Sequence, residues 1–302
     1  MKVKKLKINK LKCDYLLKRI VSSDPILNKE DITINIDKLN IGSSYKPYLK
    51  EFIKNTKDDF NFRNPNEKLR TLKINHYKES VYLIKYNKIK LCKRKDIYHE
   101  LFHALTSFNR DSNQSFSGFN QYSMFYNVGT LFDEGYTDLS TKRYFNEEIL
   151  YMIEANIARK TEIILGEKTM RDFYTSNNLY AIIKFLSRFS SEEEAIAFIS
   201  SIDKLSIYRN NIKRSIQIMN ILSNYLVDVY LNFLVKIYSQ GKFGKADINI
   251  FLSIFKEEFT KYAFYNDDVE KEYLKSSDYL DITSKLSNSN FREELRKKVL
   301  TK

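Results

Sequence analysis

Two of the three histidines in this chain lie in one pentapeptide, His99-Glu100-Leu101-Phe102-His103. Residues four apart on an α-helix share one face, so both imidazoles can point to a single metal ion at the Zn–N distance of about 2 Å. Glu100 lies one step around the helix, where its carboxylate can reach a metal-bound water without binding the metal itself. This HExxH spacing requires a helix here and indicates a catalytic zinc site.

The stretch around the pentapeptide has the pattern of an amphipathic helix. Asp96 is a favourable N-cap residue, and the helix is expected to run to about Ser107. The face opposite the histidines is apolar, with Ile97, Leu101, Ala104 and Leu105. This face can pack into the core and hold the two histidines in place.

The rest of the chain predicts an α+β fold. Period-two apolar patterns in residues 32–36 and 71–92 predict strands, with a turn at Asn87-Lys88, and residues 48–60 predict a helix that ends near Asn64-Pro65. Residues 108–129 are rich in Asn, Ser, Gly and aromatic residues and predict a long loop.

Beyond Thr130 the pattern is almost wholly helical. We expect helices near residues 130–144, 147–165, 178–188, 191–202, 206–239, 246–265 and 290–300. The chain therefore divides into an α+β half, residues 1–145, and a helical half, residues 146–302. The two halves together could form one continuous domain.

Composition limits the classes of partner and location. The net charge of +13 comes from lysines spread along all 302 residues, so we expect no specific nucleic-acid partner. The basic run in residues 2–12 is not followed by a continuous apolar segment, which argues against a secretory signal. We expect a cytoplasmic protein, although secretion of a processed form would fit the same sequence. The sequence makes no prediction of oligomeric state.

The most apolar stretch, Ile216–Tyr238, has polar residues at four-residue intervals. They are Asn220, Asn224, Asp228, Asn232 and Lys236. Such spacing forms one polar stripe along a helix, which predicts a half-buried helix and no membrane span.

A catalytic zinc site needs a third protein ligand and one open position. Thr106 and Asn109 occupy the positions where the longer HExxHxxGxxH motif has Gly and His, and His76 lies upstream on a predicted strand. We therefore expect a carboxylate from downstream. Glu134 supplies it from the first turn of the next predicted helix.

Three features of the sequence around Glu134 strengthen this expectation. Thr130 and Asp133 form a start that resembles a capping box. Asp138 lies one turn after Glu134 on the same face, where it can accept the second N–H of a zinc-binding imidazole. Gly135 would let two helices approach closely at the metal.

Together, His99–His103 and Glu134–Asp138 resemble the gluzincins, the thermolysin-like zinc metallopeptidases. The sequence Asp133–Asp138 is similar to the EG-x-T-acid form of small bacterial members, and Tyr151–Phe173 resembles the segment that follows it. The firm part of this resemblance covers residues 80–145. It implies a zincin-like N-terminal half and a zinc-dependent hydrolase that cleaves peptides or proteins.

The resemblance also implies individual roles. His99, His103 and Glu134 would be the zinc ligands, with Asp138 behind a ligating imidazole. Glu100 would be the general base and then the proton donor to the leaving amine. A strand within residues 80–92 would bind an extended peptide by backbone pairing.

Gluzincins usually also place a Tyr or His over the oxyanion. No histidine follows His103, so Tyr208, beside Arg209, is the candidate for this role.

Two alternatives remain open. Gly129-Thr130-x-x-Asp133 matches the GTxxD pattern of aspzincins, in which Asp133 would be the third ligand, although the spacing to Asp138 favours Glu134. The chain could also be a non-catalytic binding or regulatory protein that keeps the same fold and uses its helical half as an interaction surface. Glu100 favours catalysis, because a structural zinc site does not need that carboxylate.

Overall fold

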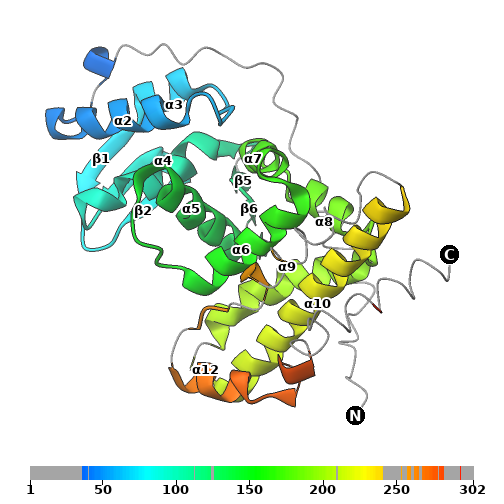
Figure 1. Cartoon of the computed structure of the whole chain (residues 1–302). Coiled ribbons are helices and arrows are strands. Elements are labelled where there is room, and N and C mark those ends of the chain that lie inside the picture. The colour runs from blue at the N-terminus through cyan, green and yellow to red at the C-terminus, as the bar shows by residue number, and fades with distance from the viewer. Residues whose placement is uncertain are drawn as a thin grey trace.

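Two small sheets and a set of packed helices make up this α+β protein, as Figure 1 shows. The computed structural model describes residues 36–39, 41–111, 113–123, 126–208 and 210–240, and parts of 253–293. The expected α+β class and helical C-terminal half are confirmed. The expected strand at 32–36, the helix at 290–300, most of the helix at 246–265 and the basic run at 2–12 lie outside the described residues. One hydrophobic core runs from Ile36 to Tyr273 through both halves.

The first elements are two 3₁₀ turns, η1 (Ile36–Lys38) and η2 (Ser43–Tyr45), and two helices, α2 (Lys46–Thr56) and α3 (Pro65–Thr71). The expected helix of residues 48–60 therefore ends early, and Asn64-Pro65 begins a helix. The Asn64 side chain accepts a hydrogen bond from the Glu67 amide at 3.2 Å. Pro65 occupies the first turn, where a missing N–H costs nothing.

The strands expected within residues 71–92 are confirmed as a three-stranded sheet. It contains β1 (Lys73–His76), β2 (Val81–Leu83) and β3 (Lys88–Leu91) in the order β1-β3-β2. β1 runs parallel to β3, and β2 runs antiparallel to it. A 3₁₀ turn, η3 (Ile84–Tyr86), and Asn87 in the left-handed conformation at φ +42° connect β2 to β3. β2 therefore lies at an edge of the sheet.

The expected long loop at 108–129 is wrong, because these residues form an antiparallel four-stranded meander. Its strands are β4 (Phe108–Asn109), β5 (Gln114–Ser117), β6 (Asn120–Ser123) and β7 (Tyr126–Val128). One face carries the buried Phe116, Gln121 and Val128. The strands are too short and too rich in Ser and Asn for their alternation to be visible in the sequence.

Most of the expected helices are present. They are η4 with α4 (Arg94–Asp96 and Ile97–Thr106), α5 (Thr130–Phe145), α6 (Met152–Leu165), α8 (Leu179–Leu186), α9 (Glu192–Ile207) and α10 (Ile212–Ser239). Two further helices, α7 (Glu167–Thr175) and α12 (Asp267–Leu274), are not among the expected ones. Gly166, at φ +89°, ends α6 and separates it from α7.

Aromatic side chains fix the back of α4. The Phe102 ring centroid lies 4.9 Å from that of Phe52 on α2 and 5.1 Å from that of Phe60. Tyr98 stacks on Phe145, the last residue of α5, at 4.0 Å. These contacts hold α4 and α5 in a fixed relation, which positions the histidines.

The long helix α10 has the length and apolar composition of a membrane span over Ile212–Ile237, and 61% of its apolar window is buried inside the protein. It packs against α6, α9 and α12. The expected half-buried helix is therefore confirmed.

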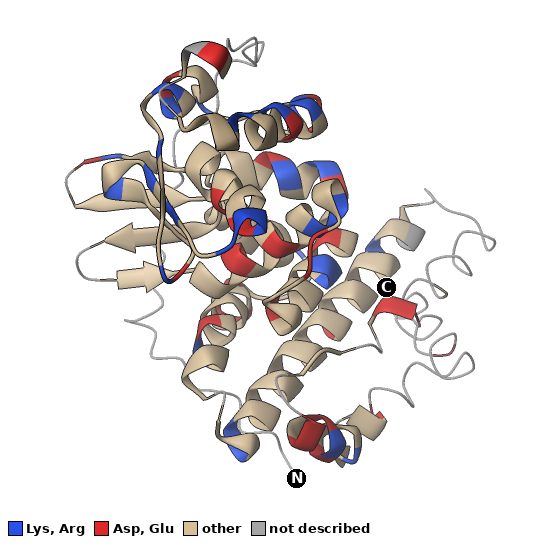
Figure 2. Ribbon diagram, turned by 90° about the vertical axis from the view of Figure 1, so that its left-hand side faces the viewer, with Lys and Arg blue, Asp and Glu red and all other residues tan. Residues whose placement is uncertain are grey.

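Charged side chains are interspersed along the molecule. Figure 2 shows Lys and Arg on most of the described elements, mixed with Asp and Glu.

The start of α5 is not capped as expected. Gly129 is the N-cap residue, and the Asp133 side chain points elsewhere. The donors at this end are satisfied by Asp203 on α9, whose carboxylate accepts from the amides of Gly129 at 2.8 Å and Leu131 at 3.0 Å. The capping partner is thus more than 70 residues away in sequence, and it ties the helical half to the helix that carries Glu134.

Replacing Asp203 with Ala is expected to lower the free energy of unfolding by about 2 kcal/mol, because it removes two charge-assisted hydrogen bonds from a helix N-terminus. Burial raises the pKa of Asp203 to about 6, against the effect of its two amide donors. The carboxylate is therefore largely ionised at pH 7.5, where urea unfolding should be measured. Glu193→Ala, at an exposed position on α9, is the control. Equal losses in both variants would refute the capping role.

Candidate metal centre

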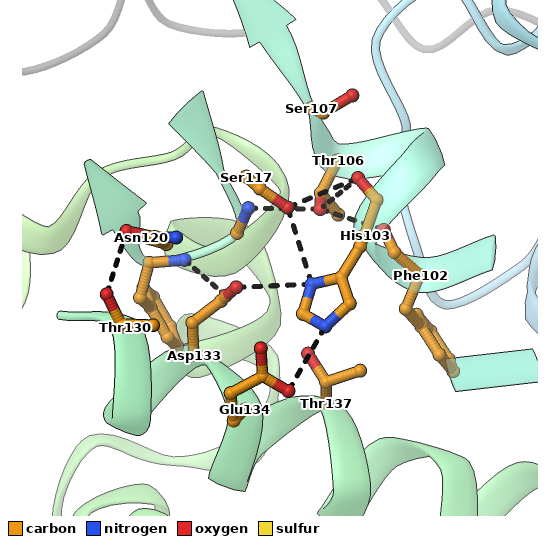
Figure 3. A network of polar contacts seen from close by, with 12 residues as sticks. Phe102, His103, Thr106, Ser107, Ser117, Asn120, Thr130, Asp133, Glu134 and Thr137 are labelled. Carbon is orange, nitrogen blue, oxygen red and sulfur yellow. Dashed lines mark hydrogen bonds and ion pairs between the residues drawn. The ribbon is translucent and has the colours of Figure 1, made fainter. Parts of the chain in front are cut away.

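Three side chains converge where α4 meets α5. His99 and His103 point from α4 toward Glu134 on α5, and Figure 3 shows His103 and Glu134 directed at one another. The Nε2 atoms of the two histidines lie 3.0 Å apart. Glu134 Oε2 lies 2.9 Å from His99 Nε2 and 3.4 Å from His103 Nε2.

One potential ligand atom from each of these residues lies within 4.8 Å of the others. Two imidazoles and one carboxylate at these distances could hold a metal ion. We call His99, His103 and Glu134 the metal group. It brings together three residues that the sequence separates by up to 35 positions.

The second nitrogen of His99 has a carboxylate partner, as expected. His99 Nδ1 donates to Asp138 Oδ1 at 2.8 Å. The other Asp138 oxygen accepts from the amides of Leu150 at 2.7 Å and Tyr151 at 2.6 Å. Asp138 is therefore held from both sides, and it fixes the orientation of the His99 ring.

Asp133 has the equivalent position behind His103. Its Oδ2 lies 3.2 Å from His103 Nδ1, and its Oδ1 accepts from the Phe119 amide at 2.7 Å (Figure 3). The carboxylate thus faces the nitrogen that points away from His99 and Glu134. Ser117 Oγ lies 3.4 Å from the same Nδ1. Each histidine of the metal group has its own aspartate.

Gly118 makes room for the Asp133 carboxylate. It has φ +50°, and a Cβ at this position would overlap both Asp133 Oδ1 and the Tyr174 ring. Position 118, in the turn between β5 and β6, therefore requires glycine for two reasons: its left-handed backbone conformation and the lack of space for a side chain.

Glu100 is buried and lines the same cavity as the metal group. Burial raises the pKa of its carboxyl group, and the charges of His103 and His99 and a hydrogen bond from the Tyr82 backbone oppose that rise. A carboxylate with a raised pKa is a better proton acceptor near neutral pH than an exposed glutamate.

The carboxylates around the two imidazoles favour protonated histidines when no metal is bound. Burial alone would lower the pKa of His99, but the bonds to Asp138 and Glu134 outweigh it and raise the pKa to about 9. The pKa of His103 is also raised, because Glu134 and Asp133 outweigh burial. The same pairing lowers the pKa of Glu134 despite its burial.

Metal binding to chelator-treated protein at pH 7 is therefore expected to release at least one proton, because a ligating imidazole must be neutral. Zinc affinity should rise with pH up to about 9 and fall as the pH is lowered. Calorimetric titration with zinc in two buffers of different ionisation enthalpy measures the proton release. A binding enthalpy that is the same in both buffers would refute this expectation.

The metal group opens into a cavity of about 540 Å³. Its walls are β2 and η3, the exposed face of β5 and β6, and the connection between α5 and α6. β2 borders the cavity through Val81, Tyr82 and Leu83, and among the described strands it pairs only with β3. A substrate in the cavity would lie beside this edge strand.

Tyr208, the expected oxyanion residue, is not among the residues that line this cavity. It follows the last turn of α9 rather than starting the long helix, and its carbonyl accepts from Ser215 Oγ at 2.7 Å. Its expected neighbour Arg209 lies outside the described residues. His76 is also apart from the metal group, because its Nε2 contacts the Tyr45 hydroxyl at 2.9 Å.

Tyr151 is the tyrosine that does lie beside the metal group. It lines the cavity, and its ring stacks near His99 with centroids 6.3 Å apart. The negative charge of Glu134 and partial burial raise the pKa of its hydroxyl, so it stays a hydrogen-bond donor. Nothing in the sequence distinguishes Tyr151 from the other 21 tyrosines, because its position depends on the bend between α5 and α6.

Comparison of the chain with protein-family models, curated proteins and solved structures finds no match.

Proposed function

We propose that this protein is a zinc-dependent metallopeptidase of the gluzincin type, with a zincin-like N-terminal half. The observation that carries the proposal is the convergence of His99, His103 and Glu134 beside a buried Glu100 in an open cavity. A sheet whose antiparallel edge strand borders that cavity, above the helix with HExxH, is what a zincin-like arrangement requires.

The donor set fits zinc. Two imidazoles and one carboxylate leave one position open for water or substrate, as in catalytic zinc sites. Asp138 and Asp133 fix the ring orientations of His99 and His103 from the second nitrogens. This arrangement favours Glu134 over Asp133 as the third ligand, because Asp133 faces the wrong nitrogen of His103. Bound zinc would lower the pKa of a coordinated water to about 7 and polarise the scissile carbonyl.

Glu100 takes a proton from the attacking water and then donates it to the leaving amine. Its burial and raised pKa suit both steps, since one carboxyl group must accept and release the same proton. A structural zinc site would not need a carboxylate facing the cavity. Glu100 therefore favours catalysis over the alternative of a non-catalytic binding or regulatory protein.

Tyr151 replaces Tyr208 as the residue that stabilises the oxyanion. Its hydroxyl remains protonated, and Tyr151 lines the cavity together with Glu134. It can donate a hydrogen bond to the carbonyl oxygen as negative charge develops there, an interaction whose loss costs about 10²–10³-fold in kcat.

The peptide backbone would lie along β2, because a strand with one unpaired side can accept an extended chain. This arrangement requires no sequence-specific contact for binding. Specificity must then come from the side chains that surround the cavity.

A mixture of synthetic peptides, read by mass spectrometry, tests the proposal. We expect hydrolysis that a chelator abolishes and that added zinc restores. Metal-loaded protein that leaves every peptide intact, at both ends and internally, would overturn the proposal in favour of the non-catalytic alternative.

A further inference from the structure

The positive charge of the protein is concentrated in and around the three-stranded sheet. Lysines occur along the whole chain, but residues 68–95 contain ten Lys or Arg and one Glu. This segment therefore carries nine of the thirteen net positive charges of the chain. It includes all three strands of the sheet, β1, β2 and β3.

The register of the strands places three lysines on one face of this sheet. Lys73 on β1 lies directly opposite Lys88 on β3, and Lys90 follows two residues later on the same face. The alternate residues of β3, Ile89 and Leu91, are buried, and this inner face packs on α4. The three lysines therefore project from the outer face, with about 4.8 Å between the strands and about 6.6 Å between Lys88 and Lys90. We call Lys73, Lys88 and Lys90 the basic face.

No described acidic residue forms an ion pair with the basic face. The Lys90 ammonium instead lies 4.0 Å from the centroid of the Tyr77 ring. Glu79, the one acidic residue of the segment, is exposed in the connection between β1 and β2. Like charges directly opposite one another destabilise a strand pair, so Lys73 and Lys88 oppose the pairing of β1 with β3.

Protection of a sheet edge accounts for only one of these lysines. A lysine on an edge strand prevents pairing with the edge of another molecule, and this explains Lys73 on β1. β3 is the central strand, so Lys88 and Lys90 protect no edge. A surface that binds a negatively charged partner explains all three.

The position of the basic face indicates which partner it fits. On the outer face, Leu83 lies opposite Lys88 and Val81 lies opposite Lys90. Both of these β2 residues line the cavity of the metal group, so the lysines begin one strand, about 4.8 Å, away from it. A polypeptide that is longer than the segment bound beside the metal group can therefore reach the basic face.

A nucleic acid fits this face less well. Proteins that bind single strands combine positive charge with aromatic rings on which the bases stack. Tyr77 is 57% exposed, but Lys90 already covers one side of its ring. An acidic polypeptide needs no such stacking surface, because its carboxylates pair with the ammonium groups directly.

Resting on the proposed function, we propose that the basic face binds an acidic segment of the protein substrate. The enzyme would thus prefer substrates that carry a run of Asp or Glu outside the residues at the metal group. The attraction acts before the chemical step and equally during it, so it lowers KM and leaves kcat unchanged.

The test uses peptides that share one cleavable sequence and carry four Glu or four Gln residues at either end. We expect kcat/KM at low salt to be about 10-fold higher for the better Glu peptide than for its Gln counterpart, at the lower end of electrostatic steering. The difference should lie in KM, and it should vanish in 1 M salt, where the Debye length is about 3 Å. Equal KM for the Glu and Gln peptides at both ends would contradict the proposal.

The triple variant Lys73→Gln/Lys88→Gln/Lys90→Gln should lose the preference for Glu and keep the parent kcat/KM for the Gln peptides. Unchanged activity on the Gln peptides shows that the variant is folded. The matched control is Lys54→Gln/Lys57→Gln/Lys213→Gln, which removes the same charge from exposed positions that do not line the cavity. Retention of the preference in the first variant, or its loss in the control, would rule out the basic face.

A binding measurement separates this inference from the proposed function. Fluorescence anisotropy of a labelled Glu-rich peptide with chelator-treated protein reports binding without turnover. Hydrolysis of Glu and Gln peptides at equal rates would remove the basic face and leave the peptidase in place. Lysine-dependent binding of the Glu-rich peptide by a protein that hydrolyses nothing would support the basic face and overturn the peptidase. Tighter lysine-dependent binding of a labelled oligothymidylate than of the Glu-rich peptide would overturn the assignment of an acidic polypeptide in favour of a nucleic acid.

Discussion

Glu100→Gln is expected to lower kcat/KM for peptide hydrolysis by about 10³-fold, within the range of about 10²–10⁴-fold for general acid–base catalysis. The amide cannot accept the proton of the attacking water or return it to the leaving amine. Zinc should remain bound, because Glu100 lies outside the metal group. Steady-state kinetics on a cleaved peptide, together with the zinc content of the same sample, measure both effects.

Glu148→Gln is the matched control for this substitution. Glu148 lines the same cavity, but its side chain is exposed and pairs with Lys95. Its loss should change kcat/KM by less than about 3-fold, because exposed ion pairs are worth about 0–1 kcal/mol. Activity of Glu100→Gln within 10-fold of the parent, or a loss of its zinc, would contradict the role of Glu100.

Gly135→Ala is expected to lower the free energy of unfolding by about 3 kcal/mol or more, at the upper end of typical overpacking costs. A Cβ at Gly135 would overlap the backbone of Glu154 and lie 2.7 Å from the Ala155 amide nitrogen. A backbone cannot rotate aside as a side chain can, so α5 and α6 must separate. This confirms the expectation that Gly135 lets two helices approach closely. Denaturant unfolding followed by circular dichroism measures the loss.

Gly42→Ala is the control for this prediction, because a Cβ there meets ordinary van der Waals contact at 3.5 Å and no left-handed backbone. Its unfolding free energy should stay within about 0.5 kcal/mol of the parent, as for most surface substitutions. Equal stability of Gly135→Ala and Gly42→Ala would show that α5 and α6 can separate without cost.

The sequence predicted the site best where one helix contains all the residues concerned. His99, Glu100 and His103 belong to one helical turn, so helix geometry alone placed them together. Glu134 and Asp138 could be anticipated from their own spacing, and the structure brings both to the histidines. In each case the residues are potential metal ligands or polar partners at the site, and their interactions require a particular direction.

The sequence was least informative where contacts join distant segments. Asp203 caps α5 from another helix, and Asp133 faces His103 because the turn at Gly118 leaves space for it. Tyr151 reaches the metal group through the bend between two helices, and the short polar strands of the meander have no clear alternation. Such features depend on tertiary packing, which local periodicity does not encode.

Zinc content after exhaustive dialysis tests the central claim, that His99, His103 and Glu134 hold a catalytic zinc ion. Elemental mass spectrometry should find about one zinc per chain in the parent protein and in Glu100→Gln, as expected for a site with three protein ligands. Asp133→Ala should bind zinc about 10- to 100-fold more weakly but still fill the site in excess zinc, as for residues that orient a ligand. Glu134→Ala should lose its zinc. Stoichiometric zinc in dialysed Glu134→Ala protein would contradict the assignment of the metal centre.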